Sequence, residues 1–165
     1  YGMLHIEKKP LNLSDLLYQL KEEMYPVFER NDLKARINIP PVLSILGDGE
    51  LLARVFENLL TNANRYGIDG QYVDINGFIE EGEVVVQIVN YGDSIPPNEL
   101  PHIFDMFYTG DKARTHQENS TGLGLFIAKN IVEQHNGTIS VESSLIRTVF
   151  EVRLPKESVA MEQSE

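Results

Sequence analysis

The sequence predicts a two-layer α/β sandwich, in which three helices pack on one face of a mixed, mostly antiparallel sheet. Three stretches carry apolar residues at helical spacing, and runs rich in β-forming residues come mostly in pairs joined by short turns. The order of these elements does not match a doubly wound parallel sheet. A chain of 165 residues suits one compact domain of this kind.

The N-terminal part predicts a short strand, a helix and two more short strands. Ser14 resembles a helix N-cap, and the apolar periodicity behind it predicts a helix over 14–31. A short strand is expected just before it, around 11–13. Residues 34–39 and 42–46 predict two strands, because the two prolines between them cannot continue one strand.

The middle of the chain predicts a second helix and a hairpin. Asp48 opens the helix, which has a broad apolar stripe and ends at Gly67. Residues 71–79 and 83–91 are rich in β-branched residues and are joined by a Glu-Glu-Gly turn, which favours a β-hairpin.

The C-terminal part begins with an unusually long irregular segment over 92–121, which is typical of a lid or a binding loop. A third helix is expected over 122–134, followed by two strands near 138–143 and 147–154. The polar residues 156–165 predict a disordered tail.

The composition argues against several kinds of partner. The net charge is −11, and an acidic surface repels nucleic acid and anionic membranes, so we expect this domain to contact neither. The chain has no cysteine, which rules out disulfides and thiol chemistry. No apolar run is long enough to span a membrane, and the N-terminus lacks a signal-peptide pattern.

Three polar residues share one face of the second predicted helix. Asn58 and Asn62 are four residues apart, and Arg65 follows three residues later. Amide oxygens can complete the coordination of Mg²⁺, and an arginine can bind a phosphate oxygen. By itself, this motif is equally well explained as a solvated polar face.

A second motif follows the strand that ends at Asn90. Its side-chain oxygen could accept a hydrogen bond from an exocyclic amine such as N6 of adenine, and Gly92 would let a purine lie against the backbone. Ile95 and a proline complete the motif. By itself, an ordinary turn is the better explanation.

The third motif is Gly122-Leu123-Gly124-Leu125, at the start of a predicted helix. Backbone N–H groups at a helix N-terminus bind anions, and glycines allow a phosphate to approach closely. Gly-x-Gly alone is weak evidence. The sequence contains neither the Rossmann fingerprint nor a Walker-type lysine motif, so those two modes of nucleotide binding lack support.

In this order and spacing, the three motifs resemble the N, G1 and G2 boxes of the ATPase superfamily of gyrase, Hsp90, histidine kinases and MutL. Residues 103–108 resemble the F box of sensor histidine kinases, and 111–114 resemble the start of their ATP lid. The likeness covers about 10–155, and the lid is similar to that of vancomycin-resistance sensor kinases. It implies the Bergerat-type fold: a five-stranded sheet on three helices, with a flexible ATP lid.

The resemblance also implies the cofactors, ATP and Mg²⁺, and the residues that bind them. Asn62 would ligate Mg²⁺ with help from Asn58, Arg65 would contact phosphate, Tyr66 would lie along the nucleotide, and Asn90 would recognise adenine. Lid cations and backbone groups would complete the site. These further residues are Gly92, Ile95, Lys112, Arg114, Gly122, Leu123, Gly124, Leu125 and Thr148.

Several positions depart from the family pattern. Arg65 stands in place of a lysine and Asn90 in place of an aspartate, while Ser94, Ser120 and Arg147 replace glycines. We therefore expect modest ATP affinity, weaker than micromolar. A degenerate interaction domain that no longer binds nucleotide stays open as an alternative.

One departure bears on the reaction. Superfamily members that hydrolyse ATP carry a glutamate at the position of Asn58, as the base that activates water. An amide cannot take that proton, and Glu57 lies about 100° round the helix. The resemblance therefore implies transfer of the γ-phosphoryl group to a protein histidine, and it disfavours the alternative of an ATP-hydrolysing enzyme.

None of the four histidines fits the acceptor pattern of the family, and we interpret His102 and His135 as structural. The acceptor is therefore expected on a dimerisation domain, with residues 1–9 as the remnant of its hairpin or linker. The implied parent protein is a membrane sensor kinase that relays phosphoryl to a response regulator. This domain would be cytoplasmic and, in isolation, monomeric.

The apolar residues of the F-box segment have two explanations of nearly equal weight. Phe104, Met106, Phe107 and Tyr108 either form a core patch beneath the lid or form a docking surface for the dimerisation hairpin.

Overall fold

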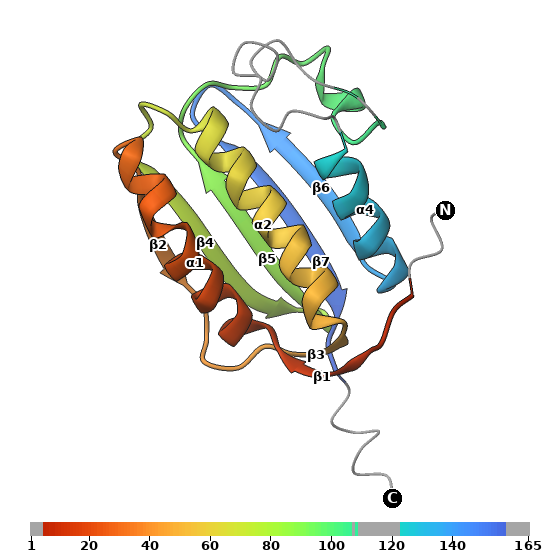
Figure 1. Ribbon diagram of the computed structural model, residues 1–165. Coiled ribbons are helices and arrows are strands. Elements are labelled where there is room, and N and C mark those ends of the chain that lie inside the picture. Colours follow the sequence, from red (N-terminus) through yellow and green to blue (C-terminus); the bar gives the residue numbers. More distant parts are fainter. Residues whose placement is uncertain (1–4, 107, 109–122, 158–165) are drawn as a thin grey trace, which may run out of the picture.

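The computed structural model describes residues 5–106, 108 and 123–157, and it confirms the predicted two-layer α/β architecture. Three helices lie side by side on one face of a five-stranded sheet (Figure 1). They are α1 (Leu13–Arg30), α2 (Gly49–Tyr66) and α4 (Gly124–Gln134). A short 3-10 helix, η1 (Leu100–His102), lies in the long connection before α4.

The sheet is mixed and mostly antiparallel, as predicted. Its strand order is β2-β4-β5-β7-β6, and only β2 and β4 run parallel. The parallel pair is joined by a long crossover that contains α2. The strands are β2 (Lys34–Asn38), β4 (Tyr72–Glu80), β5 (Glu83–Asn90), β6 (Thr138–Ser143) and β7 (Thr148–Pro155).

The two strands predicted on either side of the prolines belong to different sheets. β2 lies at the edge of the main sheet, whereas β3 (Ser44–Gly47) pairs antiparallel with β1 (Lys9–Asn12) in a separate two-stranded sheet. The prolines end a strand because they lack an N–H group, but they carry no information about its partner.

Two predicted helix starts are wrong by a few residues. The N-cap of α1 is Asn12, whose side chain accepts from the N–H of Ser14 at 3.1 Å. Ser14 is buried instead, and its hydroxyl donates to the carbonyl oxygen of Pro40 at 2.7 Å. Helix α4 begins at Gly124, two residues later than predicted.

The core lies between the helices and the inner face of the sheet. Alternate residues of β5, among them Val86 and Ile88, face the apolar stripe of α2, which includes Phe56, Leu59 and Leu60. These side chains are at most 1% exposed. Each such buried side chain stabilises the fold by roughly 1.5–3 kcal/mol, which explains why the periodic stripe specifies the position of α2.

Residues beyond the predicted domain limits also contact the fold. The N–H of Glu7 donates to Asp48, and Lys9 already belongs to β1. The N–H of Glu157 donates to the carbonyl oxygen of Ser44 at 2.9 Å, so the expected disordered tail does not begin at 156. Residues 158–165 lie outside the described part. Within the described ranges, no helix has the length and apolar character needed to cross a membrane.

The N-terminus of α2 is fixed by Asp48 and His135. The Asp48 carboxylate accepts from the N–H groups of Leu51 at 3.2 Å and Glu7 at 3.1 Å. The N–H of Asp48 donates to His135 Nε2 at 3.0 Å, while Nδ1 lies 2.8 Å from the carbonyl oxygen of Ile131. Because Nε2 accepts, the buried ring is neutral and donates through Nδ1. His135 therefore links α2 to α4, which confirms its predicted structural role.

We predict that Asp48→Ala lowers the free energy of unfolding by about 1 kcal/mol at neutral pH, through loss of the helix cap. The pKa of Asp48 lies below its ordinary value, chiefly because the N–H of Glu7 donates to it. A lowered pKa stabilises the fold above the unfolded pKa of about 4, and this contribution is lost as pH falls through the folded pKa. Urea unfolding at several pH values should therefore show a smaller difference between the two proteins in acid.

Asp15→Ala serves as the control, because Asp15 is an exposed carboxylate in the first turn of α1, whose cap is Asn12. Its effect should stay within about 0.5 kcal/mol. A loss for Asp48→Ala that is the same at every pH would contradict the electrostatic part of the cap.

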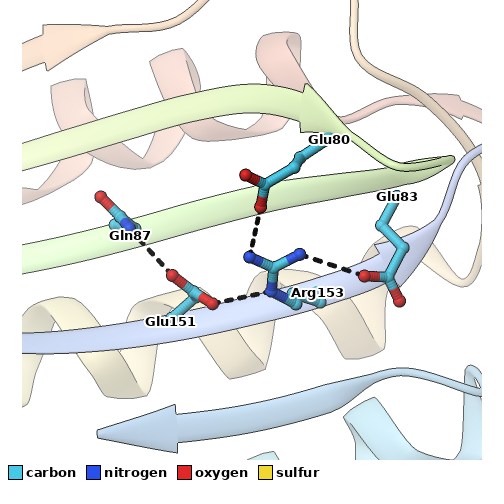
Figure 2. A network of polar contacts seen from close by, with 5 residues as sticks. All are labelled: Glu80, Glu83, Gln87, Glu151 and Arg153. Atoms are coloured by element: carbon cyan, nitrogen blue, oxygen red, sulfur yellow. Dashed lines mark hydrogen bonds and ion pairs between the residues drawn. The ribbon is translucent and has the colours of Figure 1, made fainter. Parts of the chain in front are cut away.

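In the described part of the chain, the helices lie on one face of the sheet (Figure 1), and the other, outer face carries a charged network (Figure 2). Arg153 donates to Glu151 at 2.8 Å, to Glu83 at 3.2 Å and to Glu80 at 2.5 Å, which ties β7 to β5 and β4. Gln87 donates to the other oxygen of Glu151 at 2.8 Å. Burial acts to raise the pKa of Glu151, but the hydrogen bonds from Gln87 and Arg153 outweigh it and lower the pKa.

We predict that Arg153→Lys lowers the free energy of unfolding, because an ammonium group cannot pair with three carboxylates in the way that a planar guanidinium group does. Chemical denaturation at low and at high salt measures this loss, which should shrink as salt screens the charges. Arg54→Lys, at an exposed position of α2, is the matched control. Equal losses for the two variants would contradict a stabilising role for the network.

Candidate nucleotide site

The C-terminal end of α2 is in backbone contact with the turn that follows β5. The N–H of Asp93 donates to the carbonyl oxygen of Tyr66 at 3.2 Å. A Cβ on Gly92 would lie 2.3 Å from that oxygen and 2.8 Å from the backbone of Gly67. The packing of the protein therefore requires glycine at this position, a reason that the sequence motif alone does not reveal.

The N-terminus of α4 is joined to the middle of α2 by Asn58. Its Nδ2 donates to the carbonyl oxygen of Gly124 at 3.0 Å. A Cβ on Gly124 would lie 3.6 Å from Cγ of Asn58, which is an ordinary contact. The described neighbours of Gly124 thus leave room for a side chain, in contrast to those of Gly92.

These two contacts bring the three sequence motifs to one end of the sandwich (Figure 1). Asn62 and Tyr66 lie one and two turns beyond Asn58 along α2, and Arg65 lies beside them. All three of these side chains are partly buried. The face of α2 that carries the asparagines is therefore flanked by α4 on one side and by the turn after β5 at its end.

Asn90 is the last residue of β5 and faces the inner side of the sheet. Its side chain is 1% exposed, and its Nδ2 has no hydrogen-bond partner within the described residues. Its partners in neighbouring strands are Val73 on β4 and Thr148 on β7, and Thr148 is 2% exposed. A buried amide without a partner is costly, which marks this position as one that a ligand can satisfy.

Ser143, which no sequence motif singles out, connects two predicted site residues. Its hydroxyl oxygen accepts from the N–H of Ile95 at 2.8 Å and lies 2.6 Å from Oγ1 of Thr148. Ile95 is thereby held over the ends of β6 and β7, close to Asn90. The only sequence signal for Ser143 is its place in the last predicted hairpin, which does not reveal this contact across to Ile95.

A second missed group fixes the backbone between Asn90 and Gly92. The hydroxyl of Tyr91 donates to Asp74 at 2.5 Å, and Asp74 also accepts two hydrogen bonds from Arg36, at 2.7 and 3.0 Å. Burial raises the pKa of Tyr91, and the hydrogen bond to Asp74 raises it further. Tyr91 is thus anchored on the outer face of the sheet while Asn90 points to the inner face.

The F-box segment packs partly into the core. Ile103 is buried, and the ring of Phe104 meets that of Phe150 edge to face, with centroids 6.1 Å apart. A shallow hollow remains between this segment and α4, lined by Met106, Phe126 and others. Phe104 and Tyr108 both pack against the buried core, so for these two residues the structure supports the core explanation. For Met106 the docking explanation stays open, and Phe107 lies outside the described residues.

Among the other histidines, His102 is exposed and its Nδ1 lies 3.1 Å from Asp105. Several predicted positions lie outside the described residues and stay predictions. These are Phe107, Lys112, Arg114, Ser120 and Gly122.

A known protein family matches the part of the chain that carries the site. The family model described as "Histidine kinase-, DNA gyrase B-, and HSP90-like ATPase" matches residues 47–158, which include α2, β4–β7 and α4. All the predicted site residues lie within this match.

The chain is 39% identical over 150 residues to the sensor protein VanS of Enterococcus faecium, covering 91% of this chain and 39% of that protein. It is 42% identical over 110 residues to the sensor protein SrrB of Staphylococcus aureus, covering 66% of this chain and 19% of that protein. The chain thus spans less than half the length of these curated relatives.

Among solved structures, the catalytic domain of the histidine kinase ThkA superposes with a TM-score of 0.79 at 26% identity. The match covers 91% of this chain and 96% of that domain, so it includes both layers of the sandwich. The chain therefore belongs to the histidine kinase-, DNA gyrase B- and HSP90-like ATPase family and is homologous to the catalytic domain of sensor histidine kinases.

Proposed function

We propose that this domain binds Mg²⁺–ATP and transfers the γ-phosphoryl group to a histidine on a dimerisation and phosphoacceptor domain. The observation that carries the proposal is the junction of the three motifs around α2. Asn58 of α2 contacts Gly124 at the start of α4. Gly92, which follows Asn90 in the turn after β5, contacts the C-terminal end of α2.

The two asparagines of α2 suit a hard cation. Since Nδ2 of Asn58 is occupied by the carbonyl oxygen of Gly124, its Oδ1 is the atom left for a ligand. Asn62 offers a second amide oxygen one turn along, and such neutral oxygens are ligands that Mg²⁺ accepts beside phosphate. When bound, Mg²⁺ neutralises phosphate charge during transfer.

The start of α4 suits the phosphates. The N-cap residue, Leu123, provides no side-chain hydrogen bond to the first turn of α4, and backbone N–H groups at a helix N-terminus bind anions. The space beside Gly124 supports the same assignment, because no described neighbour requires glycine there. In this proposal Arg65 adds positive charge from α2, and Lys112, Arg114 and Gly122 complete the phosphate site.

The base end of the site is formed by strands. Asn90 and Thr148 would contact the edge of the purine, Ile95 and Leu125 would supply apolar contact, and Tyr66 would lie along the nucleotide. Nδ2 of Asn90 has no hydrogen-bond partner in the part of the chain that the structure describes, which supports ligand binding over the alternative of a non-binding interaction domain.

The same helix argues against hydrolysis. Asn58 holds the position from which a base would activate water, its amide cannot accept a proton, and its Nδ2 is already committed to Gly124. Glu57 is exposed on another face of α2. Catalysis would therefore consist of positioning and charge neutralisation, with the nucleophile supplied by the acceptor histidine. We further propose that the parent protein is a membrane sensor kinase and that a response regulator receives the phosphoryl group from its histidine.

We predict that Mg²⁺–ATP at ten times its dissociation constant stabilises the domain by about 1.4 kcal/mol, a rise in Tm of about 3–6 °C. Asn62→Ala should abolish the part of this rise that depends on Mg²⁺. Differential scanning fluorimetry with ATP in Mg²⁺ and in EDTA measures both effects.

Asn64→Ala is the matched control, because Asn64 lies on the same helix but accepts a hydrogen bond from Asn31 at 3.0 Å. It should keep the Mg²⁺-dependent rise. If millimolar ATP raises the Tm of neither the native chain nor this control, nucleotide binding is refuted and the interaction-domain alternative gains support.

We also predict that γ-labelled ATP leaves the isolated domain unlabelled, but labels a separately produced phosphoacceptor domain from the same gene when the two are mixed. The label should be acid-labile and alkali-stable, as a phosphohistidine is. Sustained release of inorganic phosphate without acceptor would instead identify a hydrolase, and strong labelling of the domain alone would contradict an acceptor elsewhere.

A further inference from the structure

Within the described residues, one buried side-chain atom lacks a hydrogen-bond partner: Nδ2 of Asn90. The side chain is 1% exposed, at the end of a central strand and beside the tip of α2, where a Cβ on Gly67 would lie 3.1 Å from Cβ of Asn90. The Cβ of Asn90 is thus closely packed, and the amide at the end of the side chain offers a donor as well as an acceptor.

The hydroxyl of Thr148, beside this amide, can act either as a hydrogen-bond donor or as an acceptor. Thr148 stands opposite Asn90 in the adjacent strand, and its Oγ1 lies 2.6 Å from Oγ of Ser143. The oxygen of Ser143 already accepts from the N–H of Ile95. Either hydroxyl can be the donor in the pair, so Thr148 can turn its own proton toward a ligand or offer a lone pair to it.

The two purine types present opposite patterns at this edge. A 6-amino purine offers a donor at position 6 and an acceptor at N1, whereas a 6-oxo purine offers an acceptor at position 6 and a donor at N1. A carboxylate in place of Asn90 accepts only, so it would face the 6-oxo group with two acceptors opposed. An amide meets either group by turning its oxygen or its nitrogen toward it.

We infer that Asn90, together with Thr148, makes this domain accept 6-oxo purine triphosphates as well as ATP. For adenine, Oδ1 of Asn90 accepts from the 6-amino group and the hydroxyl of Thr148 donates to N1. For hypoxanthine or guanine, Nδ2 of Asn90 donates to the 6-oxo group and Thr148 accepts from N1. This inference rests on the proposed nucleotide binding and specifies which bases the site admits.

Isothermal titration with the Mg²⁺ complexes of ATP, ITP and GTP tests the inference. ITP isolates the group at position 6, because it lacks the 2-amino group of GTP. For the native chain, the dissociation constant for ITP should lie within about tenfold of that for ATP. Asn90→Asp should raise the ratio of the dissociation constant for ITP to that for ATP by at least about tenfold, chiefly because ITP binds more weakly.

Asn76→Asp is the matched control, because Asn76 lies on the outer face of β4, opposite Gln87. It makes the same chemical change away from the site, and the ratio should not change. If Asn90→Asp does not fold, Asn90→Ala provides the test, since it removes donor and acceptor together and should weaken ATP and ITP by similar factors.

The outcomes separate the two proposals. Three results would overturn the inference while leaving ATP binding by the native chain intact. They are a native ratio of dissociation constants, ITP to ATP, above about tenfold, a ratio that Asn90→Asp does not change, and an Asn90→Ala variant in which only ATP binding is weakened. Absence of binding for all three nucleotides would overturn the proposed function and the inference with it.

Discussion

The site depends on one constraint: residue 92 must be a glycine, because there is no room for a Cβ at that position. It allows the turn after β5 to meet the carbonyl oxygen of Tyr66, and it thereby holds the C-terminal end of α2 against the sheet. The other end of α2 is held by Asp48 and His135. A helix is stiff and has a fixed period, so holding both ends determines the direction of every side chain between them. The contact of Asn58 with α4 follows from that placement.

Much of this arrangement could be predicted from the sequence, because it depends on local periodicity. The apolar stripe of α2 defines the buried face, and the asparagine pair necessarily lies on another face. The hairpin of β4 and β5 follows from two β-rich runs and a tight turn between them, and it ends at Asn90. The order of the motifs then identified the family, which the matches to known proteins confirm.

What could not be predicted depends on contacts between distant residues. The pairing of β1 with β3, the contact of Ser143 with Ile95 and the link from Asp48 to His135 join segments 32 to 87 residues apart. No local pattern encodes such contacts. The cap of α1 was missed for a similar reason, because Asn12 also accepts from Leu43, which belongs to a remote segment. The lid residues Lys112 and Arg114 and the glycine at 122 stay predictions.

The outer face of the sheet has a consequence for how this domain behaves among its own kind. Val85 is fully buried there, although no described helix covers it, and its strand partners are Phe78 and Arg153. Long side chains such as that of Arg153 therefore shield the apolar groups and direct charge outward. Two copies that met through these faces would bring like charges together instead of pairing two apolar surfaces. The surplus of carboxylates in this network, three against one guanidinium group, therefore opposes the pairing of two such faces even at high local concentration.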